Sequence, residues 1–358
     1  MIYYGIAAIF PLIMWFINDY VARVNRLDEQ KKKKLTHQLT IVAILPMFLL
    51  FVLRYKYIGS DTIGYVRFFQ KEIRSYSWLE VFSKDTMRFE IGFRVYTKII
   101  SLFSDSYTFY FLINALVIFG ILMRFSFKYT ENPFVFFFLF ITLGTYAFFE
   151  TGLRQALAMV ICLLAVDCVK NKKLIPFILI VLLAYYFHKS ALIFLIIYPL
   201  SSIKKYDWII FVYAILAVVF VLGFTAFQGF FNEWVGFGYE EYVNDKGGGG
   251  IFLLLIFILY AFSFYVLYDK KGEDKTPHYI IHLALTTIIF WLLRLISRTA
   301  ERISYYYIFG LYIYFSQAIK YDKDRLSSLL KWLLILACLV LFIYRNIGIN
   351  YQFIWQGA

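Results

Sequence analysis

Most arginines of this 358-residue chain stand where a membrane protein has little topological need for cations. When the sequence is divided into apolar spans, most lysines fall in loops on the side that the first basic run, residues 23–34, marks as cytoplasmic. The arginines expected on the opposite face, or at helix ends that open onto it, are Arg54, Arg67, Arg74, Arg88, Arg94, Arg154, Arg294, Arg298, Arg302 and Arg345. A guanidinium is a planar fork that grips phosphate or carboxylate with paired hydrogen bonds, so this distribution predicts an outward-facing anion site.

The first cluster of chemically useful residues lies between Arg54 and Tyr65. Arg54 ends an apolar stretch, Gly59 permits a tight turn, and Asp61 can cap the helix that follows. One interpretation is a plain helix–turn–helix junction with Asp61 as its N-cap. The other makes Asp61 a general base, or a clamp that orients an arginine.

The second cluster is the short segment from Glu150 to Arg154. It joins two apolar stretches and places Arg154 at the start of the second, where free backbone amides also favour an anion. An interfacial ion pair and a phosphate site are both compatible with this pattern.

The third cluster is Phe187-His188-Lys189-Ser190, which interrupts an apolar stretch over 174–203. Basic residues precede and follow this stretch, so an even number of crossings is required. We therefore predict two short helices meeting at His188 on the outer side. His188 is either a structural residue or a base, since its ordinary pKa lies near neutral pH.

The fourth cluster contains Arg294, Arg298 and Arg302, with Glu301 beside them. Residues spaced by four share one helical face, so the three cations stack if the helix continues. An anion would relieve their repulsion; the alternative is a stripe of cations reaching the membrane surface.

The composition places the chain among polytopic helical membrane proteins. Hydrophobic residues make up 62% of it, and its mean hydropathy is +0.70, whereas soluble domains contain about 45–50% apolar residues. The formal charge of +13 resides mostly in short loops, which indicates topology signals and lipid contacts rather than nucleic-acid binding. The cysteines, at positions 162, 168 and 338, lie in apolar spans without ligand spacing.

We expect a single all-α transmembrane domain over 1–358, GT-C-like, with about twelve spans. An outer segment, 55–105, should carry interfacial helices because 90–104 is amphipathic and too short to span. A second outer segment, 227–250, ends in four glycines and is expected to form a mobile flap. The expected spans are 2–20, 39–54, 106–124, 133–149, 154–169, two within 174–203, 207–226, 251–268, 278–295, 303–318 and 329–346.

Several familiar catalytic patterns are missing. The sequence has no G-x-x-x-x-G-K-[ST], no H-E-x-x-H and no G-x-S-x-G. Its Asp-x-Asp pair, Asp322 and Asp324, falls in an expected cytoplasmic loop, away from the outer clusters. We therefore predict chemistry without a metal or a cofactor.

The ordered set of motifs resembles the EpsG-type branch of the Wzy-like polysaccharide polymerases. It comprises Arg54…Gly59-x-Asp61-Thr62-x-x-Tyr65, Phe89-Glu90-x-Gly92-Phe93, Arg154-Gln155-x-Leu157-Ala158, Phe187-His188-Lys189-Ser190-Ala191-Leu192 and Glu301-Arg302-x-x-x-Tyr306-Tyr307. The resemblance runs from about residue 50 to 310. It implies polymerisation of undecaprenyl-diphosphate-linked oligosaccharide repeat units into capsule, O-antigen or exopolysaccharide. The setting would be the outer leaflet of a bacterial cytoplasmic membrane, with a chain-length regulator and a flippase as expected partners.

This reading assigns roles to the clusters. Arginines would stabilise the charge that develops on a lipid diphosphate leaving group, and a base would take the acceptor proton. The candidate bases, in order, are His188, Asp61 and Glu301. The candidate diphosphate ligands are Arg54, Arg154, Arg294, Arg298 and Arg302, expected in one outward-opening cavity. The candidate sugar-binding residues are Tyr65, Glu90, Glu150 and Tyr305, with the outer aromatics Tyr76, Trp78, Trp234 and Tyr239.

Other functions compete with this one. A ligase would move the same lipid-linked glycan onto another acceptor with nearly the same site. A flippase or transporter would place charged residues along the membrane midplane, whereas here they gather at one face. A membrane acyltransferase with His188 as base would also need a cytoplasmic thioester site, and the inner loops are short and rich in lysine.

Overall fold

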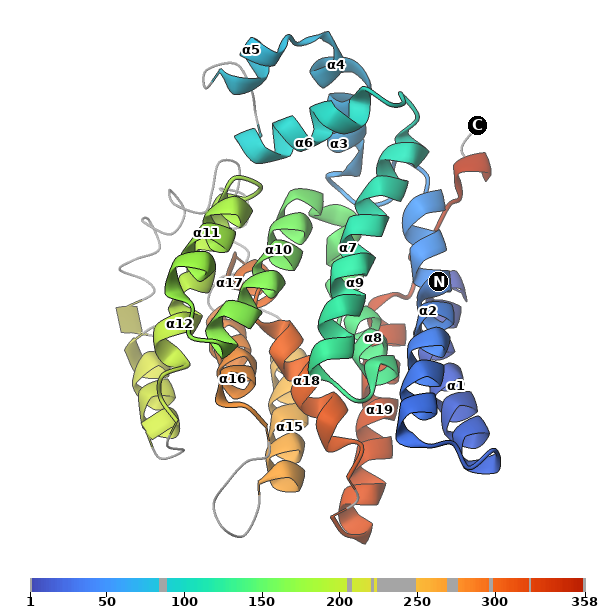
Figure 1. Ribbon diagram of the computed structural model, residues 1–358, viewed down its shortest axis with the longest axis vertical. Helices are drawn as coiled ribbons and strands as arrows, with labels where there is room; N and C mark the ends of the chain where they lie inside the picture. The colour runs from blue at the N-terminus through green and yellow to red at the C-terminus, as the bar shows by residue number, and fades with distance from the viewer. Residues whose placement is uncertain are drawn as a thin grey trace. The chain divides into compact units, whose positions relative to one another are not determined.

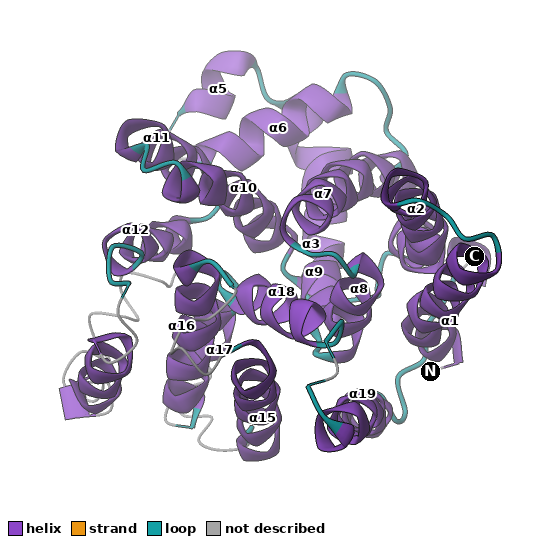
Figure 2. Cartoon of the chain, turned by 60° about the horizontal axis from the view of Figure 1, so that its bottom comes forward, coloured by secondary structure: helices purple, strands orange, loops and turns teal. Residues whose placement is uncertain are grey.

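The computed structural model describes residues 2–83, 89–204, 208–219, 222–223, 249–268, 276–295, 299–321 and 323–356. Within these ranges the chain is helical, without β-strands, as Figure 2 shows. An isolated antiparallel bridge joins Arg54 to Phe353. The all-α class predicted from composition is confirmed.

The chain forms two compact units. Unit 1 contains residues 1–160, 186–188 and 338–358, and unit 2 contains 161–185 and 189–337. The division cuts through two helices, α10 (Leu153–Lys170) and α19 (Arg325–Arg345).

Unit 1 combines long apolar helices with a group of short ones. The long helices are α1 (Ile2–Val24), α2 (Glu29–Leu53) and α7 (Tyr107–Tyr129). A bent pair follows, α8 (Pro133–Thr142) and α9 (Thr145–Thr151), with a 61° angle at Gly144, whose φ of +83° favours glycine. The short elements are α3 (Thr62–Arg67), a π-helical turn (Phe68–Glu72), α4 (Ile73–Ser75), α5 (Trp78–Phe82) and α6 (Ile91–Ser101).

The short helices occupy much of the predicted outer segment 55–105. Figure 1 shows α3, α4, α5 and α6 grouped where α2 ends and α7 begins. A capping box starts α5, in which Ser77 and Glu80 bond to each other's backbone amides. These hydrogen bonds hold the pKa of Glu80 below its ordinary value.

Unit 2 consists of helices of mixed length. They are α11 (Leu174–Tyr185), a 3₁₀ helix (Lys189–Ile196), α12 (Ile197–Leu200), a helix at Trp208–Val219, α15 (Gly250–Leu267), α16 (His278–Arg294), α17 (Thr299–Ser304) and α18 (Ile308–Ala318). The predicted break at His188 is present, because α11 ends at Tyr185 and the 3₁₀ helix begins at Lys189. The predicted flap 227–250 lies outside the described residues except for Gly249 and Gly250, which begin α15.

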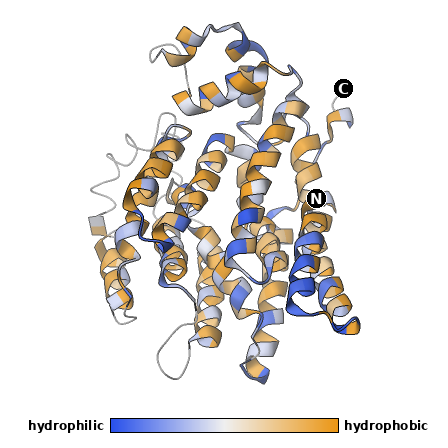
Figure 3. Ribbon diagram, in the orientation of Figure 1, coloured by the Kyte–Doolittle hydropathy of each residue, from blue (hydrophilic) through white to orange (hydrophobic). Residues whose placement is uncertain are grey.

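Among the described residues, five helices are long and apolar enough to cross a membrane: α1, α2, α7, α15 and α19. The number is six if α8 and α9 form one broken span. Several other predicted spans correspond to shorter helices, among them α11 with 12 residues and α16 with 17, which fall below the usual minimum of about 17 residues or only reach it. The membrane class is therefore supported, while twelve spans and a GT-C-like arrangement stay predictions. Figure 3 shows the contrast between the apolar helices and the hydrophilic turn that joins α1 to α2.

Candidate functional site

The turn between α2 and α3 lies directly on the backbone of Glu150. Gly59 has a φ of +89°, and a Cβ there would come within 2.9 Å of the Glu150 carbonyl oxygen. The Thr62 hydroxyl donates a hydrogen bond of 2.9 Å to the same oxygen. Together these contacts fix the turn against the end of α9.

Asp61 is held on this turn with its side chain outward. It occupies the N-cap position of α3, yet its carboxylate makes no capping hydrogen bond. The carboxylate is exposed, accepts a 3.3 Å hydrogen bond from Ser60 and forms no ion pair with any described residue. Asp61 is therefore the N-cap residue by position, as one interpretation has it, but its side chain does not cap the helix and can make other contacts.

Arg154 begins α10 among residues of the second motif. Its guanidinium donates to the Glu90 carboxylate in a short ion pair, and it lies 4.7 Å from the centre of the Phe89 ring. Tyr65 also lies within hydrogen-bonding reach of Arg154, and its ring contacts Phe89. Arg154 is thus fixed in place, with about a fifth of its side chain exposed.

The start of α6 contacts the segment between α11 and the 3₁₀ helix, which contains His188. The amides of Gly92 and Phe93 both donate to the Tyr186 carbonyl oxygen, at 2.8 and 3.3 Å. A Cβ at Gly92 would lie 2.7 Å from that oxygen, so the close approach requires glycine. His188, two residues beyond, is buried at 5% exposure.

Unit 1 therefore brings together four motif segments that are far apart in the sequence. The α2–α3 turn meets the end of α9, Arg154 meets Glu90, and Gly92 meets the segment before His188. An exposed carboxylate and a partly exposed arginine lie on connected segments of this cluster.

Arg54 departs from the prediction for a diphosphate ligand. Its side chain has 0% exposure and lies between the rings of Phe51 and Phe111, 4.0 and 4.1 Å from their centres. Glu150, proposed for sugar binding, is also buried and accepts a 2.7 Å hydrogen bond from the Tyr4 hydroxyl. Both side chains are therefore enclosed by other residues of unit 1.

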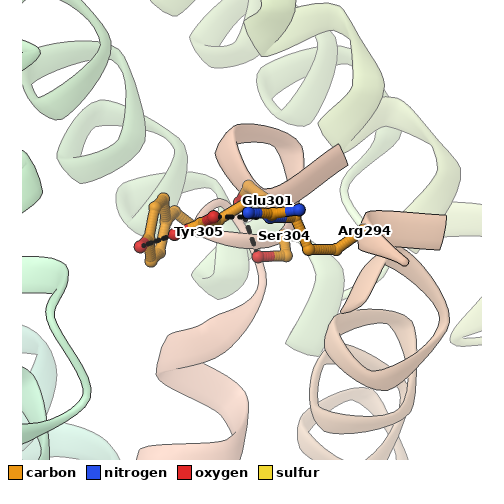
Figure 4. A network of polar contacts seen from close by, with 4 residues as sticks. All are labelled: Arg294, Glu301, Ser304 and Tyr305. Carbon is orange, nitrogen blue, oxygen red and sulfur yellow. Dashed lines mark hydrogen bonds and ion pairs between the residues drawn. The ribbon is translucent and has the colours of Figure 1, made fainter. Parts of the chain in front are cut away.

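The predicted arginine stripe of the fourth cluster is not continuous. The helix α16 ends at Arg294 and α17 begins at Thr299, while Arg298 lies outside the described residues. Arg294 instead pairs with Glu301 at 2.8 Å, and the Tyr305 hydroxyl donates to the other carboxylate oxygen at 2.9 Å, as Figure 4 shows. Glu301 is thus engaged on both sides. Arg302 lies in the same helix, α17.

The model of the EpsG family matches residues 38–356, which is most of the chain. The chain belongs to the EpsG family. This confirms the resemblance inferred from the ordered motifs, and EpsG membership associates the chain with polysaccharide polymerisation. Among curated proteins and among solved structures, no match was found.

Several arginines that were predicted to face outward stabilise the fold of this EpsG-family chain. Arg74 donates to the carbonyls of Ser101 and Ser104, and Arg94 donates to that of Ser83. Arg67 pairs with Glu72 on the surface. The expectation that outer arginines as a group bind anions is therefore too broad, because short helices leave carbonyls that cations satisfy. Arg88 lies outside the described residues.

Three candidate sugar-binding residues of the EpsG-family chain, Tyr65, Glu150 and Tyr305, are buried, whereas Glu90 and Tyr76 are partly exposed. Tyr65 and Tyr305 have 4% and 3% exposure, and both contact other motif residues. Trp78 is exposed on α5, whereas Trp234 and Tyr239 lie outside the described residues. Tyr65 therefore packs beside Arg154, and Tyr305 is hydrogen-bonded to Glu301. Among the described residues, no three His, Cys, Asp or Glu side chains gather closely enough to hold a metal ion.

Gly92 and Tyr351 have positional roles that the sequence analysis did not assign. Thr62 and Gly92 lie in the quoted motifs, and glycine beside a helix start is a signal of close backbone approach. Tyr351 packs against Tyr4 near the other end of the chain, and no local pattern indicates such a contact.

Proposed function

We propose that the chain polymerises undecaprenyl-diphosphate-linked oligosaccharide repeat units at the outer leaflet of the bacterial cytoplasmic membrane. In each cycle the acceptor hydroxyl attacks the anomeric carbon of the donor glycan. The bond from that carbon to the diphosphate oxygen breaks, undecaprenyl diphosphate leaves, and a base takes the hydroxyl proton. The reaction needs no nucleotide, because the diphosphate already activates the donor.

The convergence of motifs around Arg154 is the observation that supports this proposal. An arginine fixed over an aromatic ring and paired with a carboxylate is ready to exchange that carboxylate for a lipid diphosphate. Two parallel hydrogen bonds would then stabilise the charge that grows as the glycosidic bond breaks. Glu90, released from Arg154, would turn to the sugar.

We assign the base to Asp61. It is exposed on a turn pinned to Glu150, whereas His188 is buried at the seam with α6. A carboxylate serves as general base in many glycosyl transfers, because the transition state already carries cationic character at the sugar. Glu301 instead orients Arg294 within unit 2. We keep Arg294, Arg298 and Arg302 as predicted anion ligands of that unit.

Purified protein in liposomes tests the function. Lipid-linked repeat units supplied without nucleotide sugars should give a ladder of lipid-linked products, each longer by one repeat unit. Single transfer to an unrelated acceptor would indicate a ligase. Movement of the donor across the bilayer without elongation would indicate a flippase, and either result contradicts the proposal.

A further inference from the structure

Two opposite charges are buried together in unit 1. Arg54 has 0% exposure and Glu150 has 3%. The two side chains belong to one buried cluster, because Tyr4 donates to Glu150 and packs on Tyr351, two residues before Phe353, which forms a backbone bridge with Arg54. No ion pair joins Arg54 to Glu150 among the described residues. Burial of a charge is unfavourable unless compensating groups hold it, so removing either charge would leave the other poorly compensated.

Each charge is held by its own surroundings. The Arg54 guanidinium lies between Phe51 and Phe111, and its Nε and Nη1 atoms find no acceptor among the described residues. The Glu150 carboxylate accepts from Tyr4 through one oxygen, while the other has no hydrogen-bond partner in the described chain. These unused polar atoms mean that hydrogen bonds alone do not compensate the two buried groups.

The C-terminal segment closes this cluster. Tyr55 donates its amide to Gln352 at 2.9 Å, and Arg54 forms a backbone bridge with Phe353. The Tyr351 hydroxyl donates to the Leu50 carbonyl at 2.5 Å. A lipid diphosphate at the surface therefore does not reach Arg54.

The position of the Glu150 backbone affects two residues proposed to contact substrate, Asp61 and Arg154. Its carbonyl oxygen accepts from Thr62 and lies against Gly59, which places the turn of Asp61. Four residues further along the chain, Arg154 begins α10 beside Glu90. A shift of Glu150 would therefore move both the proposed base and the proposed diphosphate ligand.

We infer that Arg54 and Glu150 are positioning residues, whose buried attraction sets the place of the Asp61 turn and of Arg154 without contact with substrate. Their catalytic effect rests on the proposed function. The effect of Glu150 on the turn follows from its contacts with Gly59 and Thr62 alone.

A double-mutant cycle with Arg54→Met and Glu150→Gln tests the inference. Each single change leaves one uncompensated buried charge, so we expect kcat to fall by about tenfold or more and KM for the donor to change little. The double variant should recover most of the lost kcat and thermal stability, because neither charge is left alone. Arg54→Lys, which keeps the charge, should lose less than Arg54→Met.

The surface pair Arg67 and Glu72 supplies a matched control. Its side chains are 74% and 43% exposed, with 3.4 Å between them. The cycle with Arg67→Met and Glu72→Gln should show almost no coupling in kcat or stability. Coupling as large as that of the buried pair would contradict the inference.

Other outcomes overturn the inference directly. A rise in KM for the donor in Arg54→Met that the double variant does not reverse would make Arg54 a diphosphate ligand. If the kcat and the thermal stability of the double variant are no higher than those of the worse single variant, Arg54 and Glu150 are not coupled. If each single variant loses thermal stability but keeps full kcat per folded molecule, Arg54 and Glu150 contribute to stability and not to catalysis.

A spin label on the turn tests the positioning role without measuring polymerisation, so it separates this inference from the proposed function. Ser60 is exposed beside Asp61, and the native cysteines Cys162, Cys168 and Cys338 are buried. A label at Ser60→Cys should become more mobile in each single variant and return to its original line shape in the double variant. That result would support the positioning role even if no polymer formed, whereas an unchanged line shape in all variants would contradict it.

Discussion

At the residue scale, the main difference between Asp61 and His188 is the solvent exposure of their side chains. Asp61 is exposed on a turn held by Gly59 and Thr62, whereas His188 is buried two residues beyond Tyr186. From sequence His188 ranked first, because its ordinary pKa suits a base at neutral pH. Its burial depends on a contact between α6 and the break after α11, which a single sequence does not reveal.

Asp61→Asn should slow elongation by about 100-fold or more, the usual contribution of a general base, because the amide cannot take the acceptor proton. Donor binding should persist, since Asp61 does not hold the diphosphate. The rate of ladder formation at saturating donor measures the effect. Loss of elongation in His188→Gln together with a normal rate in Asp61→Asn would transfer the role of base to His188.

At the element scale, α6 and the break before His188 depend on one glycine. Gly92→Ala places a Cβ 2.7 Å from the Tyr186 carbonyl oxygen, so the helix start must move. We expect a stability loss of about 1–3 kcal/mol, as for other overpacked sites. The thermal midpoint of the purified protein measures it.

Gly64→Ala is the control for this change. Gly64 lies within α3, and a Cβ there meets nothing within 4 Å. Alanine should be neutral or stabilise the helix by up to about 1 kcal/mol. Equal losses in both variants would show that the seam between α6 and Tyr186 is unimportant.

Local elements were predictable where one segment carries its own signal. The turn at Gly59, the break at His188 and the helical character of 90–104 each follow from short patterns. The functions of Arg74 and Arg94 were not predictable, because their acceptors are carbonyls of other segments. The cluster of Tyr4, Glu150 and Tyr351 joins residues from both ends of the chain and has no local pattern.

At the scale of the whole molecule, composition was sufficient for the membrane class because hydropathy sums over the chain. The number of spans was not predictable in the same way, since α11 and α16 are apolar but short. Whether such a helix crosses the bilayer depends on its neighbours as well as its sequence.

The orientation of the chain gives a further prediction. Cysteines introduced at Ser60 and Lys189 should react with an impermeant reagent from outside, whereas one at Lys173 should react only from the cytoplasm. The loops 23–38, 170–173, 204–206, 269–277 and 319–328 are all expected on the cytoplasmic side. Native cysteines are buried, so their background labelling should be low. Labelling of Ser60 only from the cytoplasm would invert the orientation.

The most direct measurement of the central claim is ladder formation by Arg154→Lys, beside Arg67→Lys as a control. Lysine keeps the charge but loses the two-pronged fork, so polymer formation from lipid-linked repeat units should fall by about 100-fold while the protein still inserts. Arg67, whose side chain is mostly exposed and pairs with Glu72, should tolerate the change. A wild-type ladder from Arg154→Lys would contradict the account, because Arg154 would then be a structural cation and not the group that stabilises the leaving diphosphate.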